Sequence, residues 1–319
     1  MSSYTIGVDL GGTNLRVAAV DEHGQTLERI TLDTELSLGR DRVIDDMCAA
    51  IQQLTQKHAS ARLLGIGIGV PGVIDLHAGT VRAAANLPGW AGFPVRAEIE
   101  RRLHTQIILE NDARVATLGE KWLGAGRSVN DMAMLTLGTG VGGGLVLGGK
   151  IWYGIHGMGG EFGHFTVEPE GHPCGCGNRG CLEQYASATA VVRMAREAVA
   201  EGAASLSRAT ELSSKAIYEL AMQGDPSAQK IFRRMGRALG IVLGDMVNGL
   251  NLPMYVIGGG AVSAWDAFAP TMFEELKARS VVYAATSSDA LPAAQKTMIT
   301  QATLGSDAGL LGAARLPLM

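Results

Sequence analysis

The sequence predicts an α/β fold with two related halves, and three observations lead to this prediction. Apolar, strand-like segments alternate with helical segments along the chain, which is typical of α/β folds. A unit of strand, glycine turn and strand occurs twice, around residues 10–13 and again around residues 137–140. Hydrophobic residues make up 47% of the 319 residues, which is enough for a large core without disulfide bonds.

The first half is expected to open with three strands. The glycine turn at 10–13 and an Asp-Glu-His-Gly turn at 21–24 separate these strands. The next expected elements are a helix at about 40–58, a strand at 63–70 that Pro71-Gly72 ends, a helix at 96–103, a strand at 106–109 and a helix at 113–123.

The second half is expected to begin with two strands between residues 132 and 147. Residues 132–149 carry no charge and could imitate a membrane span. Their glycines, however, divide the apolar residues into two short groups, so we predict strands rather than a membrane helix. A mostly helical region at 188–248, a strand at 254–257 and a last helix at 306–314 are expected to follow.

Charge and the N-terminal segment exclude several classes of protein. Lys and Arg number 27 against 31 Asp and Glu, and the net charge of −4 gives no broad positive field for nucleic acid. The first residues show no basic stretch followed by an apolar stretch, so no secretory signal is expected. We therefore expect a soluble, cytoplasmic protein whose partners include neither nucleic acid nor a membrane.

Glycine is unusually abundant, and its 43 residues are about twice the average share. The glycines cluster in short loops, which favours backbone that approaches a ligand such as phosphate. Two nucleotide motifs almost match these loops. Residues 138–143 have the dinucleotide-binding spacing, but a strand rather than a helix is expected to follow. Residues 144–150 have the P-loop spacing, but Ile151 stands where a hydroxyl residue is needed, so we reject both.

The segment Asp9-Leu10-Gly11-Gly12-Thr13-Asn14 predicts a phosphate-binding hairpin instead. Its glycines allow backbone N–H groups to approach phosphate oxygens, Thr13 can donate its hydroxyl, and Asp9 can hold a hydrated Mg²⁺. Taken alone, the segment could also be an ordinary tight hairpin with an acidic flank. The similar turn at 137–140 favours the phosphate interpretation.

Three glycine segments, in this order, resemble the two phosphate segments and the adenosine segment of the superfamily of actin, sugar kinases and heat-shock-chaperone ATPases. They are Asp9-x-Gly11-Gly12-Thr13, Leu137-Gly138-Thr139-Gly140 and Ile257-Gly258-Gly259-Gly260. The resemblance implies two ribonuclease-H-like lobes of the actin and hexokinase type, with Mg-ATP in the cleft between them. We expect a small lobe at 1–115, completed by a C-terminal helix at about 302–319, and a large lobe at 116–301.

Three of the cysteines stand together in a glycine-rich loop, whereas Cys48 lies alone in a helical segment and is interpreted as a core residue. Cys174-x-Cys176-x4-Cys181 follows His164 by ten residues. Three thiolates and one imidazole are the ligand set of a closed, structural Zn²⁺ site, which has no open position for a catalytic water. Free thiols in a loop are the alternative. The expected zinc loop spans residues 164–181 of the large lobe.

The segments around this loop closely resemble the hallmark of the ROK family (repressor, open reading frame, kinase). The first is Gly159-Gly160-Glu161-Phe-Gly-His164, and the second runs from Cys174 through Cys181 to Glu183. The resemblance covers the chain from Asp9 to at least Gly260. It implies that Glu161, His164 and Glu183 bind sugar hydroxyls, and that His164 uses its second ring nitrogen for zinc.

Asn111-Asp112 follows the expected strand at 106–109 and opens a helix. Alone, this pair could be no more than a helix N-cap. In the ROK pattern the matching Asp is the catalytic base and the Asn binds the sugar, so the resemblance implies these roles for Asp112 and Asn111. Gly72 and Asn86 are candidates for the wall of the sugar pocket, and their alternative is a role as turn residues only.

Together these features predict an ATP-dependent hexose kinase that phosphorylates glucose at its 6-hydroxyl. A kinase of N-acetylglucosamine or N-acetylmannosamine is the close alternative, because those members share most of the sugar-binding set. A sugar-sensing repressor without catalysis is a second alternative, but the first strand is expected to start at Tyr4, which leaves no room for an N-terminal helix-turn-helix. An actin-like ATPase would not explain the zinc loop. The family implies a homodimer or a homotetramer.

Overall fold

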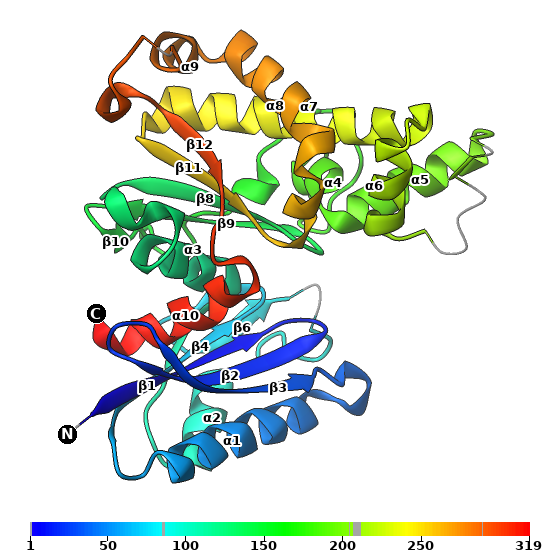
Figure 1. Ribbon diagram of the computed structural model, residues 1–319. Helices are drawn as coiled ribbons and strands as arrows, with labels where there is room; N and C mark the ends of the chain where they lie inside the picture. The colour runs from blue at the N-terminus through cyan, green and yellow to red at the C-terminus, as the bar shows by residue number, and fades with distance from the viewer. Residues whose placement is uncertain (1, 85–86, 204, 207–211, 289) are drawn as a thin grey trace. The chain divides into compact units, whose positions relative to one another are not determined.

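The computed structural model describes residues 2–84, 87–203, 205–206, 212–288 and 290–319. The described chain divides into two compact units. The first unit comprises Met1–Asn130, Gly144–Gly160 and Ala302–Met319, and the second comprises Asp131–Gly143 and Glu161–Gln301 (Figure 1). These units are defined by internal contacts, so the lobes expected at 1–115 with 302–319 and at 116–301 stay a prediction.

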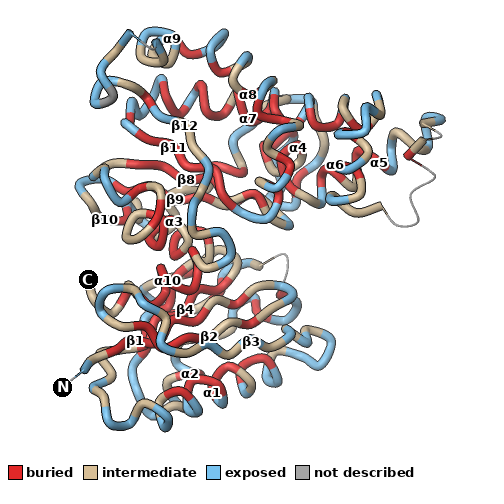
Figure 2. The backbone as a smooth tube through the Cα atoms, viewed as in Figure 1, coloured by how far each residue is buried: buried red, intermediate tan, exposed pale blue. Residues whose placement is uncertain are grey.

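The first unit is built on a mixed sheet with the strand order β3-β2-β1-β4-β7. Its strands are β1 (Ser3–Leu10), β2 (Asn14–Asp21), β3 (Thr26–Asp33), β4 (Arg62–Val70) and β7 (Ile108–Asn111). The strands β1, β2 and β3 pair antiparallel, whereas β4 lies parallel to both β1 and β7. The mostly buried β1 and the buried end of β4 form the centre of this unit (Figure 2).

Helices cover both faces of this first sheet. One face is covered by α1 (Arg40–Lys57) and α2 (Val95–Leu103), and the other by α10 (Ala308–Arg315), which packs on α3 (Asp112–Trp122) (Figure 1). Glycines make the contact with α10 possible: a Cβ on Gly7 would lie 2.3 Å from the carbonyl oxygen of Leu310, and one on Gly67 would lie 2.0 Å from that of Ala313. The helix therefore rests directly on sheet backbone.

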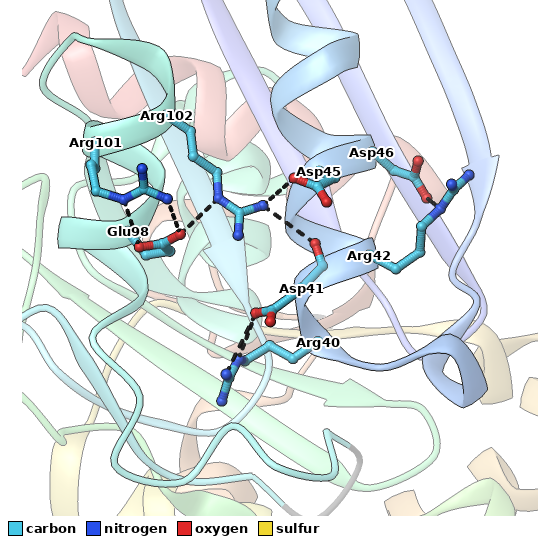
Figure 3. A network of polar contacts seen from close by, with 8 residues as sticks. All are labelled: Arg40, Asp41, Arg42, Asp45, Asp46, Glu98, Arg101 and Arg102. Atoms are coloured by element: carbon cyan, nitrogen blue, oxygen red, sulfur yellow. Dashed lines mark hydrogen bonds and ion pairs between the residues drawn. The ribbon is translucent and has the colours of Figure 1, made fainter.

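The α1 and α2 helices are joined by a network of charged side chains (Figure 3). Arg102 of α2 donates from Nε to the Glu98 carboxylate at 2.8 Å, and its other nitrogen bonds Asp45 of α1. Glu98 also pairs with Arg101. Because these groups are partly exposed, the network orients the two helices at little gain in stability.

The second sheet has the strand order β10-β9-β8-β11-β12. Its strands are β8 (Met132–Leu137), β9 (Val141–Leu147), β10 (Lys150–Ile151), β11 (Met254–Gly258) and β12 (Met298–Gln301). The helices of the second unit are α4 (Glu183–Ala186), α5 (Ala188–Ala200), α6 (Ser214–Met222), α7 (Pro226–Leu250), α8 (Trp265–Arg279) and α9 (Val281–Thr286). The short β5 (Val73–Asp75) and β6 (Thr80–Ala83) pair as a hairpin in the first unit.

Most expected elements are confirmed, including the three opening strands, the helix at 40–58 and the two strands at 132–147. The strand expected at 106–109 lies two residues later, because β7 continues to Asn111. The sequence did not predict α8, which carries Pro270 in its interior, or β12. In the described ranges we find no helix of the length and hydropathy that a membrane span requires.

Candidate active site

The turn from β7 into α3 holds the pair predicted as sugar ligand and base. Asn111 caps α3, because its Oδ1 accepts a hydrogen bond from the backbone N–H of Arg114 at 3.1 Å. Its Nδ2 donates to Asp112 Oδ1 at 2.9 Å, and the N–H of Ala113 donates to the same oxygen at 2.9 Å. Two donors thus fix the Asp112 carboxylate at the positive end of a helix, where negative charge is stabilised.

Gly72 lies beside this turn. The amide of Asn111 donates to the Gly72 carbonyl oxygen at 3.0 Å. Gly72 has a φ of 104°, and a Cβ there would lie 2.4 Å from the Ala83 carbonyl oxygen, so this backbone fits only glycine. The structure therefore brings three of the predicted sugar-site residues together in the first unit, while Asn86 lies outside the described residues.

The first glycine turn lies between β1 and β2. The N–H of Gly11 donates to the Asn14 carbonyl oxygen at 2.8 Å and closes the turn, and Gly12 has open space where a side chain would begin. Burial raises the pKa of Asp9, at the end of β1, to about 6, although Arg16 lies 3.7 Å away and opposes this shift. The turn thus offers exposed backbone donors beside one ionisable carboxylate.

The second glycine turn lies between β8 and β9. The N–H of Gly138 donates to the Gly140 carbonyl oxygen at 2.9 Å, and the Thr139 carbonyl oxygen accepts from the Thr189 hydroxyl at 2.8 Å. The third glycine segment, 258–260, packs against this turn: a Cβ on Gly259 would lie 2.4 Å from the Leu137 carbonyl oxygen. The second unit therefore brings together the predicted second phosphate segment and the predicted adenosine segment.

The predicted zinc ligands form a cluster. One ligand atom from each of His164, Cys174, Cys176 and Cys181 lies within 4.8 Å of all the others. The Cys176 and Cys181 sulfurs are 3.7 Å apart, and the Cys174 sulfur lies 3.7 Å from His164 Nδ1. Zn–S bonds of about 2.3 Å in a tetrahedron separate two sulfurs by about 3.8 Å, so the four residues fit a zinc ion.

A zinc ion would need these cysteines as thiolates. Burial and the neighbouring thiols raise the pKa of Cys181 to about 12. A divalent cation among the sulfurs would relieve this repulsion and favour thiolates. The zinc ion itself remains a proposal that rests on these distances and on the donor set.

The predicted sugar ligands of the second unit lie against the same cluster. While Nδ1 of His164 faces Cys174, its Nε2 lies 4.0 Å from the Glu161 carboxylate. Glu183, at the start of α4, accepts a hydrogen bond from the Val141 N–H at 2.9 Å and lies 4.0 Å from the Cys174 sulfur. Glu183 therefore joins the cysteine cluster to the second glycine turn, a link between residues far apart in sequence.

Sequence reasoning missed a buried ion pair next to Asp112. Arg114 donates from Nε to Glu110 Oε1 at 2.7 Å, and both side chains are at most 4% exposed. The i,i+4 spacing of opposite charges was the available signal, but it crosses the junction between a strand and a helix, where that helical rule does not normally apply.

These sheets and sites define the class of protein: a mixed α/β fold of the hexokinase type, with paired glycine turns and a Cys₃His cluster. The ROK family profile matches residues 5–318, and the chain belongs to the ROK family.

The similar proteins include glucokinases, N-acetylmannosamine kinases and xylose repressors. A glucokinase from Thermotoga maritima is 38% identical over 98% of this chain and 96% of its own length. A glucokinase from Halalkalibacterium halodurans is 36% identical over 97% of this chain and 93% of its own length. Among solved structures, a ROK family glucokinase from Streptomyces griseus in complex with glucose and AMPPNP has a TM-score of 0.80, 34% identity and 98% coverage of both chains.

Proposed function

We propose that the protein is a glucose kinase that transfers the γ-phosphate of ATP to the 6-hydroxyl of glucose. The carrying observation is the Asn111–Asp112 turn, in which two donors orient a carboxylate at the start of a helix. Transfer to an alcohol needs such a carboxylate to take the hydroxyl proton, together with donors for the phosphate oxygens. Similarity to glucokinases over nearly the whole chain supports the choice of glucose.

Each group has a place in this reaction. Asp112 accepts the proton of the sugar hydroxyl as that oxygen attacks the γ-phosphorus, and the bond from phosphorus to the leaving ADP oxygen breaks. Backbone N–H groups of the two glycine turns hold phosphate oxygens, with Gly258–Gly260 on the nucleoside side. Asp9 holds the hydrated Mg²⁺ of Mg-ATP, which neutralises charge on the phosphates.

Sugar recognition is assigned to Asn111, Glu161, His164 and Glu183. Hydroxyl groups are bound well by carboxylates and imidazoles that are held in place. A structural zinc would be held by His164, Cys174, Cys176 and Cys181. It would fix the loop that carries these four residues and would leave no open coordination position. Gly72 shapes the wall beside Asn111. The lobe boundaries, a homodimer or homotetramer and a cytoplasmic location remain predictions of this proposal.

A coupled ADP-release assay with Mg-ATP over glucose, mannose, fructose, N-acetylglucosamine and N-acetylmannosamine tests the proposal. We expect kcat/KM for glucose to be at least about tenfold above the others, which corresponds to about 1.4 kcal/mol of discrimination. A higher value for an acetamido sugar would overturn glucose as substrate but keep the kinase. No turnover with any sugar would overturn the kinase and favour a sugar sensor.

The role of Asp112 is tested by Asp112→Asn. We expect kcat to fall by about 10²–10⁴, because general-base help is lost, while glucose still binds. Asn111 remains the cap of α3 in this variant, so a purely structural residue at the start of the helix would tolerate the change. Asp225→Asn, at the cap of α7, is the matched control and should leave kcat unchanged. Near-normal kcat in Asp112→Asn would remove this residue from the base role.

A further inference from the structure

A buried ion pair brackets the proposed base. Glu110 is the residue before Asn111, Arg114 is two residues after Asp112, and their side chains meet at 2.7 Å with exposures of 4% and 2%. Glu110 Oε1 also accepts the backbone N–H of Asn111 at 2.7 Å. The pair therefore joins the residues on either side of the Asn111–Asp112 turn, and Glu110 also bonds the backbone of the turn.

Arg114 reaches a second segment as well. Its guanidinium donates to the Gly159 carbonyl oxygen at 3.4 Å and lies 5.9 Å from the ring of Tyr153. The Tyr153 hydroxyl in turn hydrogen-bonds Glu110, and burial together with the Glu110 charge raises the pKa of Tyr153 to about 12. One guanidinium thus contacts both the turn of the base and the Gly159–Gly160 segment, which runs directly into Glu161.

Stability alone does not explain such a pair. Removing two charges from water costs about as much as their attraction returns, so buried ion pairs are often no better than apolar side chains of the same volume. A guanidinium supplies something that an apolar side chain cannot. Its donors point in fixed directions and can hold two backbone segments in one geometry.

We propose that Arg114 is a positioning residue for phosphoryl transfer. Through Glu110 it fixes the orientation of the Asn111–Asp112 turn, and through the Gly159 carbonyl it fixes the start of the segment that leads to Glu161. With a side chain that is only 2% exposed, it would act without touching either substrate. This inference rests on the proposed function, because it assigns Arg114 to the sugar side of that same reaction and not to the ATP side.

Arg114→Lys is the first test. Lysine keeps the charge beside Glu110, but its single ammonium group cannot reproduce the fork that spans Glu110 and Gly159. We expect a folded protein in which KM for glucose rises and kcat falls, each by about tenfold, since small misplacements of reacting groups are costly. KM for Mg-ATP should stay within about twofold of the wild type, because Arg114 contacts neither glycine turn.

Arg102→Lys is the matched control. Arg102 makes the same bond, Nε to a glutamate four residues earlier, at 2.8 Å from Glu98, and it also reaches a second partner, Asp45, on another helix. It lies in the network of Figure 3, between α1 and α2. We expect Arg102→Lys to leave kcat and both KM values unchanged. Equal kinetic losses in the two variants would overturn the inference, since they would report a general loss of structure.

A double variant gives a second test. Glu110→Gln combined with Arg114→Met leaves no unpaired buried charge, so it should fold even if Arg114→Lys does not, and it should show the same split between glucose and ATP. Unchanged glucose KM and kcat in either folded variant would overturn the positioning role. If the wild type is inactive with every sugar of the panel, the proposed function fails, and this inference fails with it. If the wild type is active but the variants keep its glucose KM and kcat, only this inference fails.

Discussion

The two glycine turns are alike in sequence and differ in what surrounds them. Each joins neighbouring strands of its own sheet, β1 to β2 or β8 to β9. Each is closed by one backbone hydrogen bond, from Gly11 to Asn14 at 2.8 Å or from Gly138 to Gly140 at 2.9 Å. Both turns are therefore glycine hairpins that a backbone hydrogen bond closes, and we propose the same phosphate-binding role for both.

The side chains around them are not interchangeable. Two residues before its first glycine, the first turn has Asp9, whereas the second has Thr136 at the matching place. The second turn is followed by Val141, whose N–H is bonded to Glu183, and Glu183 lies against the cysteine cluster. In the proposed reaction, the first turn would supply charge for Mg²⁺, and the second would be linked to a sugar ligand through Glu183.

Among substitutions in and around the two turns, the largest expected effect comes from removing the charge of the first turn. Asp9→Asn should lower kcat/KM for Mg-ATP by about 10²–10³, the usual loss when one electrostatic group for the transition state is removed. KM for glucose should change little. Thr136→Val is the matched control in the second turn and should keep kcat/KM for Mg-ATP within about threefold, because no charge is removed. A loss below tenfold in Asp9→Asn would contradict the metal role.

The second prediction concerns the cysteine cluster that Glu183 joins to the second turn. Cys176→Ala should abolish bound zinc and lower kcat/KM for glucose by about 10–100-fold, because groups that orient ligands have effects of this size. Metal content measured on the purified protein, together with glucose kinetics, checks this. Cys48→Ala is the control: this cysteine is buried on α1 and should cost stability but no zinc. A fully active wild type without zinc would contradict the prediction.

Local patterns in the sequence predicted much of both turns. Glycines and a threonine at fixed spacing indicate a backbone cradle, and three cysteines with a histidine indicate a metal cluster, because ligands close in sequence can converge through one loop. The Asn111 cap was predictable for the same reason: a cap satisfies N–H groups only two or three residues away.

Contacts between distant segments were not predictable. Gly7 and Gly67 add to the glycine surplus because α10 rests on their strands, and not because they approach a ligand. The bond from Val141 to Glu183 joins residues 42 positions apart. Arg114 lies close to Gly159 only once β7, α3 and the loop after β10 have assembled. Only the folded chain brings these groups together.

Substitution of one glycine in each turn should have different effects. A Cβ on Gly140 would lie 2.3 Å from Glu183 Oε2, whereas a Cβ on Gly12 would meet nothing within 4 Å. Gly140→Ala must therefore displace the Glu183 carboxylate, which accepts the hydrogen bond from Val141. We expect Gly140→Ala to raise KM for both ATP and glucose, by about tenfold for glucose.

Gly12→Ala should raise KM for ATP only, because its methyl group would lie in the turn proposed to hold phosphate and would meet nothing within 4 Å. Steady-state kinetics with each substrate varied in turn separates the two variants. Equal effects of the two substitutions on glucose would contradict the link through Glu183.

The smallest expected effect is a pH dependence. Only the first turn should cause it, because only this turn has an ionisable group. Burial raises the pKa of Asp9 from 3.8 to about 6 in the folded protein. Between these two values the folded state binds more protons than the unfolded state, so the contribution of Asp9 to stability is greatest below about pH 4 and is lost as the pH rises to about 6.

Affinity for Mg-ATP should change in the opposite direction, because Mg²⁺ needs the ionised carboxylate. With a pKa of about 6, about half of the free protein carries the proton on Asp9 at pH 6 and about one tenth at pH 7. KM for Mg-ATP should therefore be about twofold higher at pH 6 than at pH 7 and nearly constant above pH 7. Asp9→Asn should abolish this rise while Thr136→Val keeps it. A rise that persists in Asp9→Asn would assign the titration to another group and leave the two turns equal in this respect.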